Sequence, residues 1–286
     1  MTGFAIVLIL LSAFFHASWN LLAKRSSGGV GFVWLFSALA SVLYAPVAFI
    51  VLLWQKPDLG GVELLLMTGS GLLHFVYFLL LQQGYKLGDL SLVYPLARGT
   101  GPLLSSMVAI LFLGERPTPL ALLGLSLIAI GAFLLTSQSS PNGNGTNHRA
   151  IGYGLLVGTV IAAYTLWDKQ GVSTFLVPPV LMDYGSNLSR TILLSPVAVH
   201  HWRSVCAEWK MHRWEAIGVA CLSPFAYILV LTALAFTPVS YVAPLREISI
   251  LIGVMMGAKL LAEGNTQRRL AGAGVMVCGA VALAIG

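Results

Sequence analysis

Charged side chains are scarce in this sequence. Of its 286 residues only 9% are Asp, Glu, Lys or Arg, whereas 57% are hydrophobic. Ordinary soluble domains have about 25% charged and roughly 45–50% apolar residues. A soluble fold of this length could not cover so much apolar surface. The composition therefore excludes a water-soluble globular protein and indicates an integral membrane protein.

Cysteines and catalytic motifs are also sparse. The three cysteines, Cys206, Cys221 and Cys278, show neither a CxxC spacing nor a Cys/His metal pattern. No recognisable set of nucleophile and base is present, and no glycine-rich loop that would bind a phosphate. We therefore expect no catalytic residue, no metal site and no cofactor, and we do not expect an enzyme.

The net charge of +6 does not call for a nucleic-acid partner, because Lys and Arg of membrane proteins collect in cytoplasmic loops. No Lys or Arg precedes the first apolar run, Gly3 to Ala23. A cleaved secretory signal begins with basic residues, so this run is expected to be a retained helix. The expected partners are the lipid bilayer and a small-molecule substrate. A monomer is sufficient, and a homodimer stays open.

Long apolar runs define the fold class. A helix needs about 20 apolar residues to cross the hydrocarbon core, and several runs reach that length. Taking the polar breaks as loops predicts an all-α integral membrane protein with about ten transmembrane helices. The predicted spans are 3–23, 30–54, 62–84, 90–113, 119–136, 150–168, 174–199, 215–236, 239–260 and 269–286.

One polar stretch, residues 137–149, separates the chain into halves of similar length. Its Ser, Asn, Gly and Pro residues favour turns. The predicted organisation is a first five-helix repeat over 1–136, this linker, and a second five-helix repeat over 150–286.

The two halves resemble each other in sequence. Three pairs of segments match in the same order: 17–24 with 162–169, 92–96 with 241–245, and 113–115 with 261–263. Because each half has an odd number of spans, the second enters the membrane with the opposite orientation. Such inverted repeats are typical of secondary transporters that work by alternating access.

Ionisable residues inside the predicted spans are the first candidates for a substrate site, because a charge in a membrane is costly and faces a cavity or a partner. Arg98 follows Pro95, and Arg246 and Glu247 follow Pro244. Prolines at matching places in two repeats point to a transport site, and an arginine there could hold a carboxylate or phosphate.

Tyr94 lies on the same helical face as Arg98 and is a further candidate for substrate contact. The roles of the charged residues are open. Glu247 is a candidate proton carrier, since a carboxyl group removed from water takes up a proton more readily. The alternative is that Arg98 or Arg246 pairs with Glu247 only to hold helices together.

Other polar and aromatic residues extend the candidate site. Asp183, Asn187 and Arg190 fall on one stripe of the seventh span, either as part of a wet cavity or as a packing network. His16 and His74 are added as proton-coupling candidates. The remaining candidates for substrate contact, besides both histidines, are Trp19, Asn20, Tyr77, Tyr164 and Tyr227.

The segments HASWNLLAK, YPLARGTGPLLSS and LGERPT, with APLRE and LLAEG in the second half, resemble the drug/metabolite transporter superfamily and its EamA-like ten-helix members. The resemblance implies a membrane transporter and does not fix its cargo. The prediction is an exporter of amino acids or related compounds in the bacterial cytoplasmic (inner) membrane, with proton coupling as a further hypothesis. A flippase or carrier for lipid-linked or nucleotide-linked sugar groups is the alternative. A non-transporting structural membrane protein is the alternative of another class.

Overall fold

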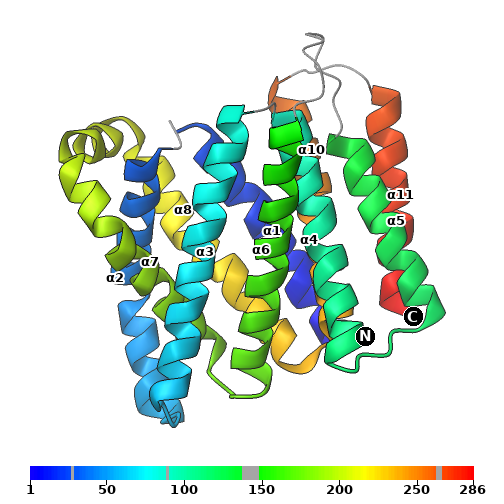
Figure 1. The fold of residues 1–286 in the computed structure, drawn as a ribbon, viewed down its shortest axis with the longest axis horizontal. Helices are drawn as coiled ribbons and strands as arrows, with labels where there is room; N and C mark the ends of the chain where they lie inside the picture. Colours follow the sequence, from blue (N-terminus) through cyan, green and yellow to red (C-terminus); the bar gives the residue numbers. More distant parts are fainter. Residues whose placement is uncertain (27–28, 88–89, 137–147, 262–265) are drawn as a thin grey trace. The chain divides into compact units, whose positions relative to one another are not determined.

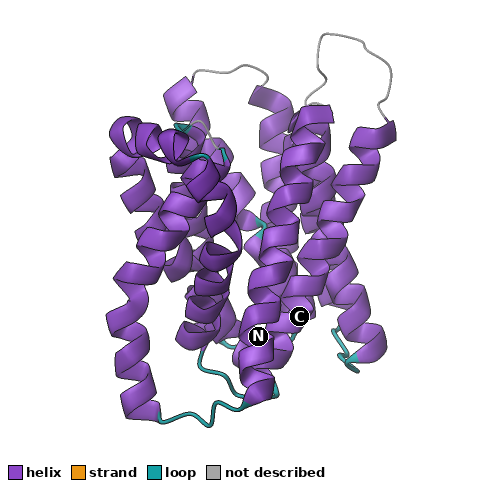
Figure 2. Cartoon of the chain, turned by 60° about the vertical axis from the view of Figure 1, so that its left-hand side comes forward, coloured by secondary structure: helices purple, strands orange, loops and turns teal. Residues whose placement is uncertain are grey.

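The chain is helical throughout its described part. The structure, a computed structural model, describes residues 1–26, 29–87, 90–136, 148–261 and 266–286. Within these ranges only helices and connecting loops are present (Figure 2). The helices are α1 (Gly3–Lys24), α2 (Val30–Gln55), α3 (Gly61–Leu87), α4 (Leu90–Phe112), α5 (Pro119–Thr136), α6 (His148–Ser173), α7 (Pro179–His200), α8 (Trp202–Phe236), α9 (Val239–Arg246), α10 (Ile248–Leu261) and α11 (Thr266–Ile285).

The described helices have the composition of membrane spans. Five of them are long and apolar enough to cross a bilayer. Large apolar side chains on their surfaces are exposed, for example Val42 at 71% and Phe49 at 60% on α2. Lipid is the solvent that accommodates such a surface. The chain is therefore a multi-pass integral membrane protein, as its composition predicted.

Two predicted spans differ from the structure. The eighth was expected to begin at residue 215, but α8 already begins at Trp202, and its backbone leaves helical geometry at His212. Residues 202–211 were assigned to a loop because they are polar, yet they are helical. The seventh was expected from residue 174, but α7 begins at Pro179, because a proline fits the first turn of a helix and disfavours helical geometry in the residue before it.

The predicted ninth span, 239–260, is divided into two helices. It is interrupted at Glu247, between α9 and α10. Pro244 has no backbone N–H, so the Ser240 carbonyl lacks its usual helical donor. The chain then tightens, with the Glu247 N–H donating to the Pro244 carbonyl at 3.0 Å and the Ile250 N–H donating to the Glu247 carbonyl at 2.9 Å.

The chain forms two compact units that do not coincide with the sequence halves. One unit contains residues 1–13, 76–166 and 237–286, and the other contains residues 14–75 and 167–236. Each unit therefore takes helices from both halves of the sequence. Helices α1, α3 and α6 contribute to both units.

In the first unit, α5 and α11 pack closely along their lengths (Figure 1). A Cβ on Gly124 would lie 2.6 Å from the Gly279 carbonyl oxygen, and one on Gly279 would lie 2.8 Å from the Gly124 carbonyl oxygen. Small residues allow such close approach of membrane helices. Ile128 of α5 and Met276 of α11, both buried, add an apolar core with Ile250 of α10.

In the second unit, α2 packs against α7 and α8. Phe32 and Leu35 of α2 share an apolar core with Ala198 of α7 and with Val205 and Val219 of α8. Polar contacts join the same helices. The Trp34 Nε1–H donates to Ser195 Oγ at 3.0 Å, and the Tyr44 hydroxyl donates to the Cys221 carbonyl at 2.6 Å.

Equivalent helices of the two sequence halves run antiparallel within each unit. Along α2 and α7, Trp34 contacts Ser195 and Ser41 contacts Thr191, so the numbering rises on one helix while it falls on the other. The Gly124 and Gly279 approach described above and that of Gly131 to Met276 follow the same rule in α5 and α11. This is the geometry of an inverted repeat, which the odd number of spans per half predicted.

We predict that Gly124→Ala destabilises the protein. The added methyl group would overlap α11, and overpacking costs about 1–3 kcal/mol, more than the gain of up to about 1 kcal/mol in helix propensity. Thermal melting of the purified protein in detergent measures the change as a lower Tm.

The control is Gly274→Ala, because a Cβ on this α11 glycine meets nothing within 4 Å. Its Tm is expected to be unchanged or slightly higher. Equal Tm values for the two variants would contradict close packing of α5 on α11.

Candidate functional site

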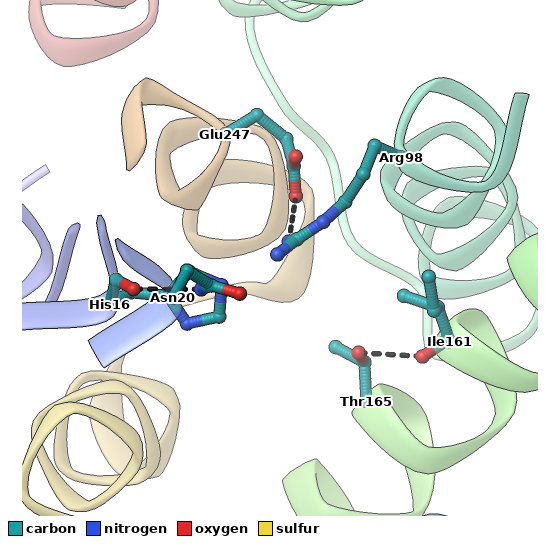
Figure 3. Close-up of polar contacts among 6 residues, drawn as sticks. All are labelled: His16, Asn20, Arg98, Ile161, Thr165 and Glu247. Atoms are coloured by element: carbon teal, nitrogen blue, oxygen red, sulfur yellow. Dashed lines mark hydrogen bonds and ion pairs between the residues drawn. The ribbon is translucent and has the colours of Figure 1, made fainter. Parts of the chain in front are cut away.

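A buried ion pair forms the centre of the candidate site. Arg98 Nη1 of α4 lies 3.3 Å from Glu247 Oε1, and the two side chains are only 10% and 5% exposed. Figure 3 shows the Arg98 side chain extending from its helix to the Glu247 carboxylate. Both residues were predicted to be site residues, and the structure brings them together. Arg98 was expected either to bind the substrate or to pair with Glu247, and both roles would involve this ion pair.

Glu247 occupies an unusual position in the backbone. It is the residue at which the helix is interrupted between α9 and α10. Its second carboxylate oxygen, Oε2, is buried and has no hydrogen-bond partner among the residues described. The backbone N–H and carbonyl of Glu247 are both hydrogen-bonded, to Pro244 and Ile250. The residue is therefore held in place, while its side chain keeps an acceptor atom for another donor.

A small hollow adjoins this pair. It is lined by Arg98 and Glu247 together with Pro244 and with apolar residues of α4 and α5, and its cavity volume is about 10 Å³. A cavity of this size has room for about one water molecule. The hollow is therefore small, with its charges at one place and apolar side chains around them.

Two other candidates of this site, Arg246 and Tyr94, are not seen to take part in the ion pair. Arg246 is the last residue of α9 and half-buried, and the ion pair to Glu247 is made by Arg98 instead. The side chain of Tyr94 lies outside the described residues. Helix α4 continues through Pro95, whereas the matching region of the second half is interrupted after Pro244. The two prolines thus have different effects on their helices.

Glu115 holds the other end of α9. Its Oε1 accepts from the Val239 N–H at 2.6 Å and its Oε2 from the Ser240 N–H at 2.9 Å. The first N–H groups of a helix have no partner within it, and Pro238, the residue before α9, offers no side-chain cap. Sequence reasoning did not foresee this cap. The match of segment 113–115 with segment 261–263, which places a Glu after α4 and another in the second half, was the sequence signal that could have singled out Glu115.

The α7 stripe predicted from the sequence is present in the second unit. Asn187 Nδ2 donates to Asp183 Oδ2 at 2.9 Å, and an Arg190 guanidinium N–H donates to Asn187 Oδ1. Arg190 Nε–H also donates to Ser37 Oγ of α2 at 3.1 Å. The three residues therefore form a continuous polar network that joins α7 to α2.

A second polar group in this unit contains His74, Tyr227 and Asp168. The Tyr227 hydroxyl donates to Asp168 Oδ2, and the rings of His74 and Tyr227 lie edge to face at 5.3 Å. Asp168 is fully buried and was not among the predicted site residues. The predicted sixth span ended at this residue, whereas α6 continues to Ser173.

The remaining candidates form local pairs. The rings of His16 and Trp19 lie 4.9 Å apart, and Asn20 Nδ2 donates to the His16 carbonyl at 2.7 Å (Figure 3). The rings of Tyr77 and Tyr164 lie 6.0 Å apart, edge to face. No group of three or more metal-ligating side chains occurs in the part of the chain that the structure describes.

Comparison with known proteins adds a family and a fold. The profile of the EamA-like transporter family matches residues 3–137 and 148–285. A solved structure described only as a crystal structure of a protein superposes with a TM-score of 0.75, covering 100% of this chain and 98% of its own, at 14% sequence identity. At this low sequence identity, the likeness shows a shared fold and no more. No curated protein matches the chain.

We predict that Arg98→Met lowers stability by about 3–5 kcal/mol, because it leaves the Glu247 charge buried without its partner. The double variant Arg98→Met/Glu247→Leu should recover most of this loss, since apolar residues replace both charges. Thermal melting in detergent compares the two. A double variant that melts no higher than Arg98→Met would show that the unpaired charge is not the cause.

We also predict that Glu115→Ala destabilises the protein by about 1–3 kcal/mol, because two backbone donors lose a charged acceptor. Glu115→Gln keeps one acceptor oxygen and should lose less. Glu63→Ala is the control, since this half-buried carboxylate accepts from one loop N–H, that of Gly60. Equal melting temperatures for Glu115→Ala and the wild type would contradict the capping role.

Proposed function

The chain belongs to the EamA-like transporter family, and from this premise we propose that it exports amino acids or related small metabolites by alternating access. It is a membrane transporter and not an enzyme, as that membership states. The proposed location is the bacterial cytoplasmic membrane. The proposed substrate site is the Arg98–Glu247 pair and the hollow beside it.

The observation that carries the proposal is the chemistry of that pair. An α-amino acid has a carboxylate and an ammonium group a few bonds apart. A guanidinium holds a carboxylate by two parallel hydrogen bonds, and a carboxylate accepts from an ammonium. Arg98 and Glu247, 3.3 Å apart, therefore present complementary charges in the order that a zwitterion requires. A substrate entering between them replaces one internal pair by two new ones.

This exchange also supports proton coupling. A proton on Glu247 removes the acceptor for the substrate's ammonium group, so the proton and the substrate compete for the same carboxylate. Competition at one site is the requirement for exchanging protons against substrate. When both have left, Glu247 returns to Arg98, which avoids an unpaired charge in the membrane.

The helix interruption supports a moving role for Glu247. Helix α9 is held at its start by Glu115 and at its end by the pair with Arg98. Releasing Arg98 frees only the end of α9, while the Glu115 cap keeps the start in place. Half-helices at the repeat interface are the usual substrate-binding elements of transporters built from inverted repeats.

The charges beside the hollow favour this proposal over the lipid-linked alternative. The hollow itself, about 10 Å³, has room for about one water molecule, so any substrate requires Arg98 and Glu247 to separate. An amino acid supplies a charged partner for each of them, whereas the phosphate of a lipid-linked sugar supplies one for Arg98 alone. His74, Tyr227 and the α7 network remain proposed contacts for later steps of transport.

The test is transport in proteoliposomes. A panel of labelled amino acids should leave the vesicles in response to a pH gradient in the wild type. Arg98→Met should abolish this flux, and Glu247→Gln should abolish its response to the gradient. Arg25→Met, which changes an exposed arginine, is the matched control and should transport normally.

Competition experiments separate the two charges of the substrate. The methyl ester of a transported amino acid lacks the carboxylate, and the deaminated acid lacks the ammonium group. Each should compete at least about tenfold more weakly than the amino acid, because one hydrogen bond between charged groups is lost. An ester that competes as well as the amino acid would overturn the role of Arg98. Movement of labelled lipid-linked sugar without flux of any amino acid would replace the proposal by the flippase alternative.

A further inference from the structure

The start of α8 carries an exposed cluster of tryptophans and cations that the transport site does not use. We call residues 202–214 the Trp–cation segment. Three neighbouring pairs repeat along it, namely Trp202 with Arg203, Trp209 with Lys210, and Arg213 with Trp214. The tryptophans are 51%, 41% and 70% exposed, and the three cations are exposed as well. A solvent-exposed cluster of three tryptophans needs a physical reason.

The segment is fixed to the protein by one face only. Val205 is buried in the apolar core that α2, α7 and α8 share, and Glu208 is also buried. A Cβ on Gly31 of α2 would lie 3.5 Å from Val205 Cγ2. The remaining faces point away from the protein, so the acidic residue is turned inward and the cations outward.

The exposed faces have a regular arrangement. Trp202 and Trp209 are two helical turns apart and form one stripe, and Arg203 and Lys210 form a second stripe beside it. Arg213 lies with its guanidinium carbon 5.5 Å from the centre of the Trp214 ring. An apolar stripe next to a cationic stripe is the pattern of helices that lie in the plane of a membrane surface.

The height of the segment in the bilayer follows from the helix before it. On α7, Ile192 is 62% exposed and Val199 is 67% exposed, as expected of side chains that face hydrocarbon. The Trp–cation segment begins directly after this apolar surface ends, and the backbone bends at His212 before α8 continues as a span. Figure 1 shows this first part of α8 as a separate stretch next to the end of α7. The segment thus lies where the headgroups are.

The corresponding connection of the first half is much shorter. Residues 56–60, between α2 and α3, contain one Lys and one Asp and follow a single exposed tryptophan, Trp54. The inverted repeat places the two connections on opposite sides of the membrane. The segment therefore makes one membrane face of the protein different from the other.

We propose that the Trp–cation segment binds the anionic headgroups of one leaflet of the bilayer. Tryptophan rings reside at the boundary between hydrocarbon and headgroups, and Lys and Arg next to them pair with lipid phosphates. Charge complementarity selects anionic over zwitterionic lipids. The segment anchors this side of the second unit to an anionic membrane surface, and this role is independent of what the protein transports.

The test measures lipid selectivity of the intact protein in phosphatidylcholine vesicles. Spin-labelled phosphatidylglycerol and spin-labelled phosphatidylcholine report the relative association of each lipid with the protein. The wild type should prefer phosphatidylglycerol. The variant Arg203→Gln/Lys210→Gln/Arg213→Gln should reduce this preference at least about fivefold, because each cation near an anionic surface contributes on the order of 1 kcal/mol.

The control is Arg25→Gln/Lys56→Gln/Arg116→Gln, which removes three exposed cations elsewhere on the chain. It should keep most of the preference for phosphatidylglycerol. The proposal is overturned if both triple variants lose the preference equally, or if neither loses it. For the wild type alone, raising the salt concentration should weaken the preference because salt screens exposed charges. A preference that does not change with salt would also overturn the proposal.

Discussion

A charge inside a membrane span has to have a partner, and much of this structure follows from that constraint. No water is available in the hydrocarbon core to solvate an isolated ion. Arg98 and Glu247 satisfy the constraint for each other, and Asp183 and Arg190 satisfy it through Asn187. Each of these contacts also joins two elements or stabilises one helix, so these charged residues within the spans are both packing contacts and functional candidates.

The same constraint applies to the backbone. Helix α9 is only eight residues long, and its ends need partners that a longer helix would satisfy internally. Glu115 supplies acceptors at one end, and the Pro244 break places Glu247 opposite Arg98 at the other. The irregular backbone is tolerated because it is buried in protein, a setting in which membrane proteins accommodate non-helical backbone. The residues that hold the ends of α9 therefore include those of the proposed substrate site.

Much of the helical layout could be predicted because lipid makes the sequence pattern simple. The spans, the internal repeat and the opposite orientation of its halves depend on runs of apolar residues and on an odd count of spans. The predicted spans were wrong where a polar segment is nevertheless helical. Residues 202–211 are polar and helical because a surface helix needs only one apolar face, supplied here by Val205. The sixth span was predicted to end at Asp168, whereas α6 continues to Ser173.

By itself, the sequence determined the fold class, the duplicated organisation and the family, since these depend on composition and on the order of motifs along the chain. It also narrowed the candidate site to a few ionisable residues. Only the tertiary structure decided that Arg98, not Arg246, makes the ion pair with Glu247 and that Glu115 caps α9. Arg246 and Arg98 have the same chemistry and similar local sequence, so their roles differ through distances between residues far apart in the chain. Those distances are set by helix packing, which no local pattern encodes.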